Sequence, residues 1–182
     1  KEWKFLKSIK SKGMLRERLV FRHTKKNVYL IADAYDGKNI KECTVDFLSA
    51  SCGRKKETIL VENIPIGVAG SAELVSYIGH DGLMDFSLDQ DFANTDNKKR
   101  KTIILACFSK KYFAPHLKNA NVEPSVWTTN LMCPEAYTVH DAIRSHLAGD
   151  SSAEMREAAA AAYSKYQKCS LKAAKGLLAT GW

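Results

Sequence analysis

Three short apolar runs constrain the fold of this chain more than any other feature of its sequence. Val28–Ala32, Leu74–Ile78 and Thr102–Ala106 are each almost continuously apolar. Strands have this character when both faces of their sheet are covered, as in parallel sheets flanked by helices. A helical pattern over residues 38–50 follows the first run. The alternation of strands with helices predicts an α/β fold with a mainly parallel sheet.

The other elements follow from shorter patterns. Residues 2–12 carry apolar side chains at helical spacing, which predicts a helix, and residues 64–70 contain one proline and two glycines, which indicate a loop. The polar and charged residues 87–101 are expected to form a surface loop. Further strands are expected at residues 18–22, 58–61 and 125–131.

The C-terminal part reads as helical. Ser151 and Glu154 have the spacing of a capping box, and a long alanine-rich helix is expected to follow them. We interpret three residues on one face of that helix as core residues: Met155, Ala159 and Tyr163. The sequence therefore predicts a helical C-terminal extension, residues 146–182, packed on the same domain.

Positive charge is concentrated at the N-terminus. The chain carries a net charge of +8, and residues 1–27 contain ten Lys or Arg against two acidic residues, whereas the remaining sequence is balanced. A basic segment of this kind can bind nucleic acid or an acidic membrane surface, or can form a solvated face. Nucleic-acid binding is not expected of any other part of the chain.

Cysteine usage and hydropathy exclude several classes of protein. The five cysteines are irregularly spaced and contain no C-x-x-C pair, so neither a thiolate zinc site nor a disulfide framework is expected. No apolar run approaches the roughly 20 residues that a membrane-spanning helix needs. No secretory leader is recognisable, and the sequence leaves both a removed leader and the compartment open.

Two of the apolar runs end in reactive side chains. His80, in the sequence Gly-His-Asp-Gly, follows the second run, and Cys107 follows the third directly. Because the carboxyl ends of neighbouring parallel strands meet at one edge of a sheet, we expect the two side chains to lie together. There the imidazole can take the thiol proton or stabilise the thiolate, which makes the sulfur a nucleophile.

This constellation resembles the caspase, gingipain and legumain superfamily of cysteine peptidases, and it is similar to bacterial caspase-like proteins with a Gly-His-x-Gly histidine block. The resemblance implies a three-layer caspase-like fold, with residues 28–145 as the catalytic domain and 1–27 as a separate basic segment. It implies His80 as general base or acid, Cys107 as nucleophile, and a peptide or protein substrate without cofactor or metal. The backbone of Asp81, Gly82 and Cys107 would supply the oxyanion hole.

Four further residues are candidates for substrate binding. Asp33 and Asp36 follow the first apolar run, where they can meet a basic substrate side chain or cap a turn and a helix. Trp127 and Thr128 lie on the strand after the nucleophile, which borders the cleft in the family, and core packing is an equal alternative for them. Leu105 occupies the place of the acidic residue of metacaspases, so basic specificity is not carried over from that motif.

The first choice of function is a cysteine endopeptidase that cleaves peptide bonds by thiol acylation. Asp81 stands where the usual pattern has a glycine directly after the histidine, so a catalytically silent caspase-like module for binding or assembly is the alternative. A nucleotide-binding α/β protein is a third reading, but no glycine-rich phosphate motif follows the first apolar run.

Overall fold

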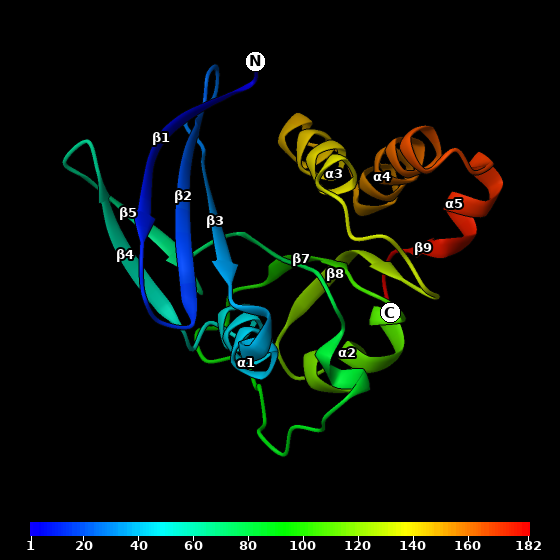
Figure 1. Cartoon of the computed structure of the whole chain (residues 1–182), viewed down its shortest axis with the longest axis horizontal. Coiled ribbons are helices and arrows are strands. Elements are labelled where there is room, and N and C mark those ends of the chain that lie inside the picture. The colour runs from blue at the N-terminus through cyan, green and yellow to red at the C-terminus, as the bar shows by residue number, and fades with distance from the viewer.

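Nine strands and five α-helices make up the computed structural model, which describes residues 1–182 (Figure 1). The strands are β1 (Trp3–Lys10), β2 (Leu15–His23), β3 (Tyr29–Tyr35), β4 (Lys56–Val61), β5 (Ile64–Ala69), β6 (Leu74–Ile78), β7 (Arg100–Leu105), β8 (Val122–Thr128) and β9 (Leu178–Ala179). The helices are α1 (Ile40–Ser51), α2 (Ser109–Leu117), α3 (Ala136–Ala148), α4 (Ser152–Gln167) and α5 (Leu171–Leu177), with two short 3-10 helices, η1 (Gly37–Asn39) and η2 (Gly82–Met84). The α/β class that the sequence predicts is confirmed, but the expectation of a mainly parallel sheet was wrong, because only two of the six strand pairings are parallel.

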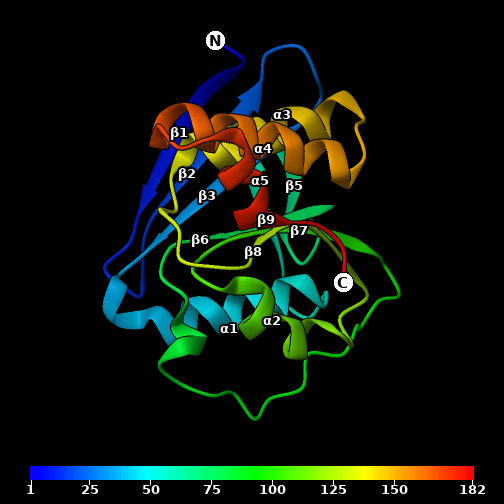
Figure 2. The same cartoon turned by 90° about the vertical axis from the view of Figure 1, so that its right-hand side faces the viewer.

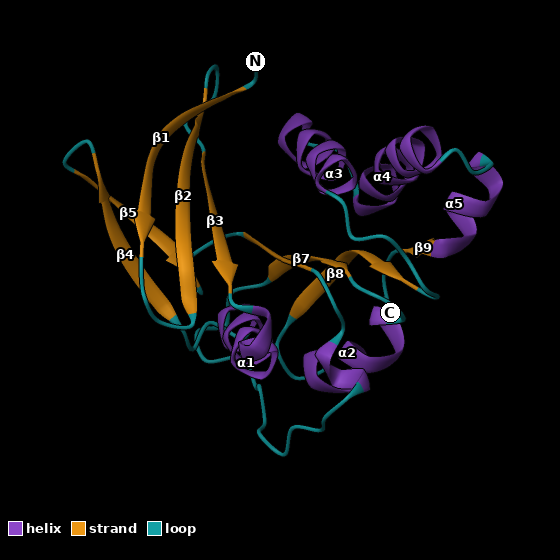
Figure 3. Cartoon of the chain, in the orientation of Figure 1, coloured by secondary structure: helices purple, strands orange, loops and turns teal.

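Parallel pairing is confined to one sheet. The strand order there is β6-β7-β8-β9, in which β6, β7 and β8 are parallel and the short β9 is antiparallel to β8. Helices α1 and α2 lie on one face of this sheet and α3, α4 and α5 on the other (Figure 2). The result is three layers, helix over sheet over helix, which Figure 3 shows by element type.

Strand β7 explains why one of the apolar runs is continuous. Residues 102–106 are all fully buried, as expected for a strand covered on both faces. Ile104 packs among the residues of α1 and α2, including Phe47, while Ile103 and Leu105 pack among those of α3, α4 and α5, including Met155. Burial of each large aliphatic side chain contributes about 1.5–3 kcal/mol, so the two-sided cover makes this strand the centre of the fold.

The N-terminal third does not join the parallel sheet. Strands β1, β2 and β3 form an antiparallel sheet of their own, so the sequence-based expectation of a parallel strand at residues 28–34 was wrong. The helix predicted over residues 2–12 was also wrong, because this segment is β1. The β1–β2 register shifts between Phe5 and Lys7, and the bulge at Leu6 gives the apolar residues a spacing that imitates a helix.

A hairpin replaces the loop predicted over residues 64–70. Strand β5 pairs with β4 in antiparallel register, and Leu60 lies opposite Pro65. Glu62 and Asn63 form the connecting turn and both have positive φ values, 50° and 64°, as in the tight turns that favour hairpins. Proline lacks a backbone N–H. It is tolerated at this position because the sheet has only two strands, so the outer side of β5 has no neighbouring strand that would need a hydrogen bond.

The C-terminal helices agree with the sequence. Ser151 and Glu154 form the predicted capping box at the start of α4, and the three residues interpreted as core are buried. The segment boundaries at 27/28 and 145/146 fall inside structured regions, the first in the β2–β3 turn and the second within α3. None of the helices combines the length and apolar character needed to cross a membrane.

Candidate active site

The two reactive side chains lie at one edge of the parallel sheet. Ile78 at the end of β6 lies opposite Leu105 at the end of β7, and His80 and Cys107 each follow two residues beyond this last pair. Both residues are therefore at the carboxyl ends of neighbouring parallel strands, where α/β proteins bind their ligands. No hydrogen bond joins the imidazole to the thiol: the imidazole pairs with Asp85, and the thiol contacts the backbone of Met132.

The His80 ring is held at the surface by Asp85. Its Nε2 atom lies 2.5 Å from Oδ2 of Asp85, and both side chains are more than half exposed. Because a carboxylate only accepts hydrogen bonds, Nε2 carries the proton in this pair and Nδ1 of a neutral imidazole keeps its lone pair. The backbone is fixed as well: the Tyr77 hydroxyl donates to the His80 carbonyl at 2.7 Å, and burial raises the pKa of Tyr77 to about 12.

Cys107 lies in a sharp turn between β7 and α2. The next residue, Phe108, has a φ of 51°, and this left-handed conformation redirects the chain from strand to helix. The half-buried Sγ atom lies 3.5 Å from the amide nitrogen of Met132 and 3.7 Å from its carbonyl oxygen. The amide and the positive end of α2 both favour negative charge that develops on the sulfur.

Thr128 and Ser109 lock this turn from inside the core. The Thr128 hydroxyl donates to the Ala106 carbonyl and accepts from the Ser109 amide at 3.1 Å. The Ser109 hydroxyl donates to the Ile104 carbonyl and accepts from the Thr128 amide, both at 2.9 Å. Thr128 is fully buried, so its predicted contact with substrate is not possible here. It ties together the residues on either side of Cys107.

Trp127 is likewise a core residue. Its side chain is fully buried and packs edge-on against Trp182, with ring centroids 5.6 Å apart. The Nζ atom of Lys110 lies over the ring, 5.3 Å from its centroid. Of the two alternatives that the sequence leaves open for Trp127, the structure favours core packing over a substrate pocket, because the side chain has no exposed surface.

Asp81 and Gly82 are turned away from the surface. Asp81 is fully buried: its Oδ1 accepts from the Leu83 amide at 3.0 Å, its Oδ2 has no partner, and burial raises its pKa to about 6. Gly82 is packed so closely that a Cβ atom there would lie 2.7 Å from the Phe86 ring. Both residues are buried, so their backbone is closed to a substrate oxygen, whereas Cys107 is partly exposed and its amide donates to no acceptor within the protein.

Asp33 and Asp36 have partners of their own. Asp33 accepts two hydrogen bonds from the guanidinium of Arg18, at 2.6 and 2.7 Å, and Asp36 pairs with Arg16, which lowers its pKa. Strand β3, which precedes Asp36, pairs only with β2 and not with the strands of the dyad. The expected position beside the dyad is therefore wrong, and neither carboxylate is a free acidic receptor for a basic substrate side chain.

Comparison of the chain with family models, curated proteins and solved structures gives no match. The caspase-like resemblance therefore stays a prediction from the motifs. No three His, Cys, Asp or Glu side chains converge into a group that could hold a metal ion. The sequence analysis did not identify Asp85 as the partner of His80 or Met132 as the partner of Cys107. Asp85 lies only five residues after His80, which was the one signal in the sequence. Only the turn through η2 brings that carboxylate back to the ring.

Proposed function

We propose that this chain is a caspase-like cysteine endopeptidase, in which Cys107 is the nucleophile and His80 the general acid and base. The observation that carries the proposal is the register of two adjacent parallel strands. Ile78 and Leu105 are paired, and His80 and Cys107 each lie two residues beyond this pair. A reactive cysteine needs a proton acceptor and an electropositive, accessible setting. The β7–α2 turn supplies the setting, and the imidazole is a proton acceptor at the same sheet edge.

The reaction requires no group beyond these side chains and water. The sulfur attacks the peptide carbonyl carbon and forms a thioester, while the C–N bond breaks and the leaving amine takes a proton from the imidazolium. Water then attacks the thioester with the imidazole as base, which releases the acid and restores the thiol. Asp85, bonded to Nε2, orients the ring so that Nδ1 is the nitrogen that exchanges the proton. The Cys107 amide stabilises the oxyanion.

The surroundings of the dyad favour an apolar substrate side chain. Ile78, Met84 and Leu131 are all exposed large apolar residues. Ile78 ends β6 just before His80, and Leu131 directly precedes Met132, whose backbone contacts the sulfur. Asp33 and Asp36 are neutralised by arginines, and Asp85 is paired with His80, so none of these three carboxylates is a free receptor for Arg or Lys.

Selective alkylation tests the dyad. An ordinary thiol is only a few per cent ionised at neutral pH, whereas a thiol paired with an imidazolium reacts in acid. We expect iodoacetamide at pH 6 to label Cys107 faster than the other four cysteines. Mass spectrometry of the peptide that contains each cysteine measures the rate of labelling. His80→Ala should remove the selectivity, and Cys107→Ala should abolish cleavage of a peptide library without unfolding the protein. The other cysteines are Cys43, Cys52, Cys133 and Cys169.

A catalytically silent caspase-like module is the second candidate, and two observations favour it. His80 and Cys107 are not hydrogen-bonded to each other, and Asp81 is buried where a glycine amide would face the substrate. This candidate predicts slow labelling of Cys107 with the same pH dependence in wild type and in His80→Ala. That result, together with no cleavage of the library, would contradict the peptidase proposal.

A further inference from the structure

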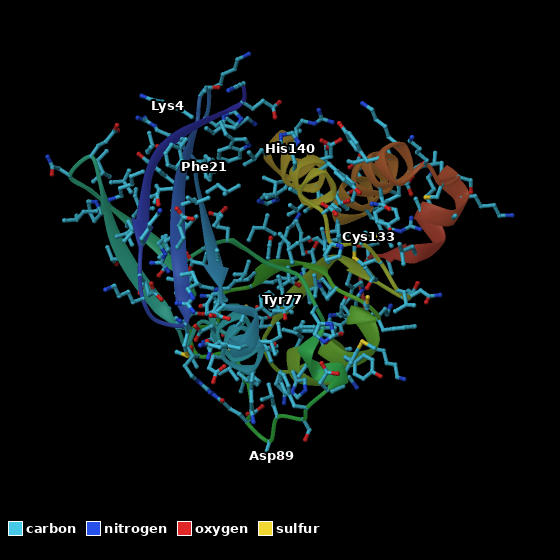
Figure 4. All side chains as sticks on the ribbon, in the orientation of Figure 1. Lys4, Phe21, Tyr77, Asp89, Cys133 and His140 are labelled. Atoms are coloured by element: carbon cyan, nitrogen blue, oxygen red, sulfur yellow. The ribbon has the colours of Figure 1, made fainter.

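A basic hollow lies at the end of the antiparallel sheet that β1, β2 and β3 form. It has a volume of about 500 Å³ and no hydrophobic or acidic residue in its lining. It is lined by Lys4, Arg22, His23, Thr24, Lys25, Lys26 and Asn27. Figure 4 shows Lys4 on β1 at this outer end of the sheet, with His140 on α3 across from it.

The strand register concentrates positive charge in this hollow. Lys4 of β1 lies directly opposite Arg22 of β2, and two like charges at such a position destabilise a sheet. The acid nearest to Arg22 is Glu62, at 3.7 Å between exposed side chains, which compensates little. Glu2, the acidic residue at the start of the chain, pairs with His140 instead. The arrangement costs stability unless a bound anion offsets the repulsion.

The hydrogen bonds of the turn restrict recognition to side chains. The amides of Lys25 and Lys26 both donate to Nδ1 of His23 at 3.1 Å, so the other ring nitrogen of a neutral His23 carries the proton and is a donor. The Thr24 amide donates to the Glu2 carbonyl. Since these amides are used internally, the hollow offers spread cationic side chains rather than a backbone cradle for a single phosphate. The Lys26 ammonium donates to the Leu147 carbonyl, so the side chains left for a ligand are those of Lys4, Arg22 and Lys25.

We propose that this hollow binds the phosphodiester backbone of a single nucleic-acid strand. Dispersed Lys and Arg side chains without an apolar lining recognise charge rather than base identity, which is how proteins track a strand's phosphates. A bilayer surface would be met by projecting basic residues accompanied by apolar ones. Arg22 also stacks over Tyr29, 5.8 Å from the ring centroid, which holds its guanidinium at the hollow. This binding is independent of the peptidase proposal.

Fluorescence anisotropy with a labelled 20-nucleotide single strand tests the inference. The protein used is the full chain carrying Cys107→Ala, so that peptidase activity does not affect the result. Three phosphate contacts, from Lys4, Arg22 and Lys25, predict a slope of about −2 in log affinity against log salt, or roughly a 20-fold loss between 50 and 200 mM. The triple variant Lys4→Ala/Arg22→Ala/Lys25→Ala should lose at least tenfold in affinity and most of the slope.

A matched variant separates a site from general charge. Lys118→Ala/Lys165→Ala/Lys172→Ala removes the same charge from exposed lysines outside the hollow, and its affinity should stay within twofold of wild type. Equal losses in both triple variants, or binding to phosphatidylserine vesicles without binding to the strand, would overturn the inference. Circular dichroism verifies that each variant is folded. The single variant Lys25→Glu repeats the test without changing a strand residue, because Lys25 lies in the turn between β2 and β3.

Discussion

The buried carboxyl of Asp81 should make the protein more stable in mild acid, and Asp81→Asn should remove this effect. Burial is the main reason why the pKa of Asp81 rises from its ordinary 3.8 to about 6; the nearby Asp85 adds to it, whereas the Leu83 amide and His80 oppose it. A group that binds its proton more tightly in the folded state stabilises the fold when protonated. Stability from this group is therefore present below pH 3.8 and lost as pH rises through 6.

The size of the effect follows from the shift. A change of about two pKa units at about 1.36 kcal/mol per unit gives roughly 3 kcal/mol between the fully protonated and fully ionised limits. About 2 kcal/mol of this should be present at pH 4 relative to pH 7.5. Asn does not titrate, and its side-chain oxygen can still accept from the Leu83 amide. The difference in unfolding free energy between wild type and the variant should therefore change by about 2 kcal/mol over this range.

Urea unfolding of both proteins at several pH values between 4 and 7.5 measures this difference. The comparison with the variant is needed because burial lowers the pKa of His116 and of His146, so these groups destabilise wild type in the same acidic range. Both proteins share that contribution, and subtraction removes it. Parallel stability curves for wild type and Asp81→Asn would refute the reasoning and indicate that water reaches the carboxyl in the folded state.

Three further predictions concern the edge of the sheet. Thr128→Val removes the hydroxyl that bridges the two sides of the Cys107 turn and should cost about 1–3 kcal/mol in unfolding free energy, with slower alkylation of that thiol. Gly82→Ala forces a methyl group against the Phe86 ring and should cost about 1–3 kcal/mol, measured by thermal or urea unfolding; an unchanged midpoint would show that the ring moves freely. Asp85→Asn should lower kcat by about tenfold or more and shift the pH profile of cleavage. Its free energy of unfolding should stay within about 0.5 kcal/mol of wild type, because the side chain is exposed. An unchanged pH profile would exclude the orienting role.

Local patterns identified the elements that carry the candidate chemistry. The apolar run that became β7 was visible because two-sided burial leaves few polar positions in a strand. The run that became β6 is similar in composition, although β6 is the edge strand and only its Tyr77 is buried. The order of elements then indicated that His80 and Cys107 share a sheet edge, and the register agrees. The capping box at Ser151 was equally local, since its two hydrogen bonds lie within three residues.

The N-terminal region shows where local patterns misled. A bulge at Leu6 gave β1 the apolar spacing of a helix, and the antiparallel strand β3 has the same apolar character as a parallel one. Strand partners are chosen across the chain, so neither error could be detected from spacing alone. The same pairing brings Arg16 and Arg18 onto the acidic residues of β3 and its following turn, which neutralises two candidates for substrate binding.

The sequence by itself determined which apolar runs form strands and which reactive residues follow two of them, because backbone preference acts over a few neighbouring residues. Only the tertiary structure decided what each reactive residue meets. Asp85 reaches His80 through the turn of η2, and the backbone of Met132 reaches Cys107 from the loop after β8. Thr128 became a buried clamp instead of a substrate contact. Such contacts depend on the packing of distant segments, which no local periodicity encodes.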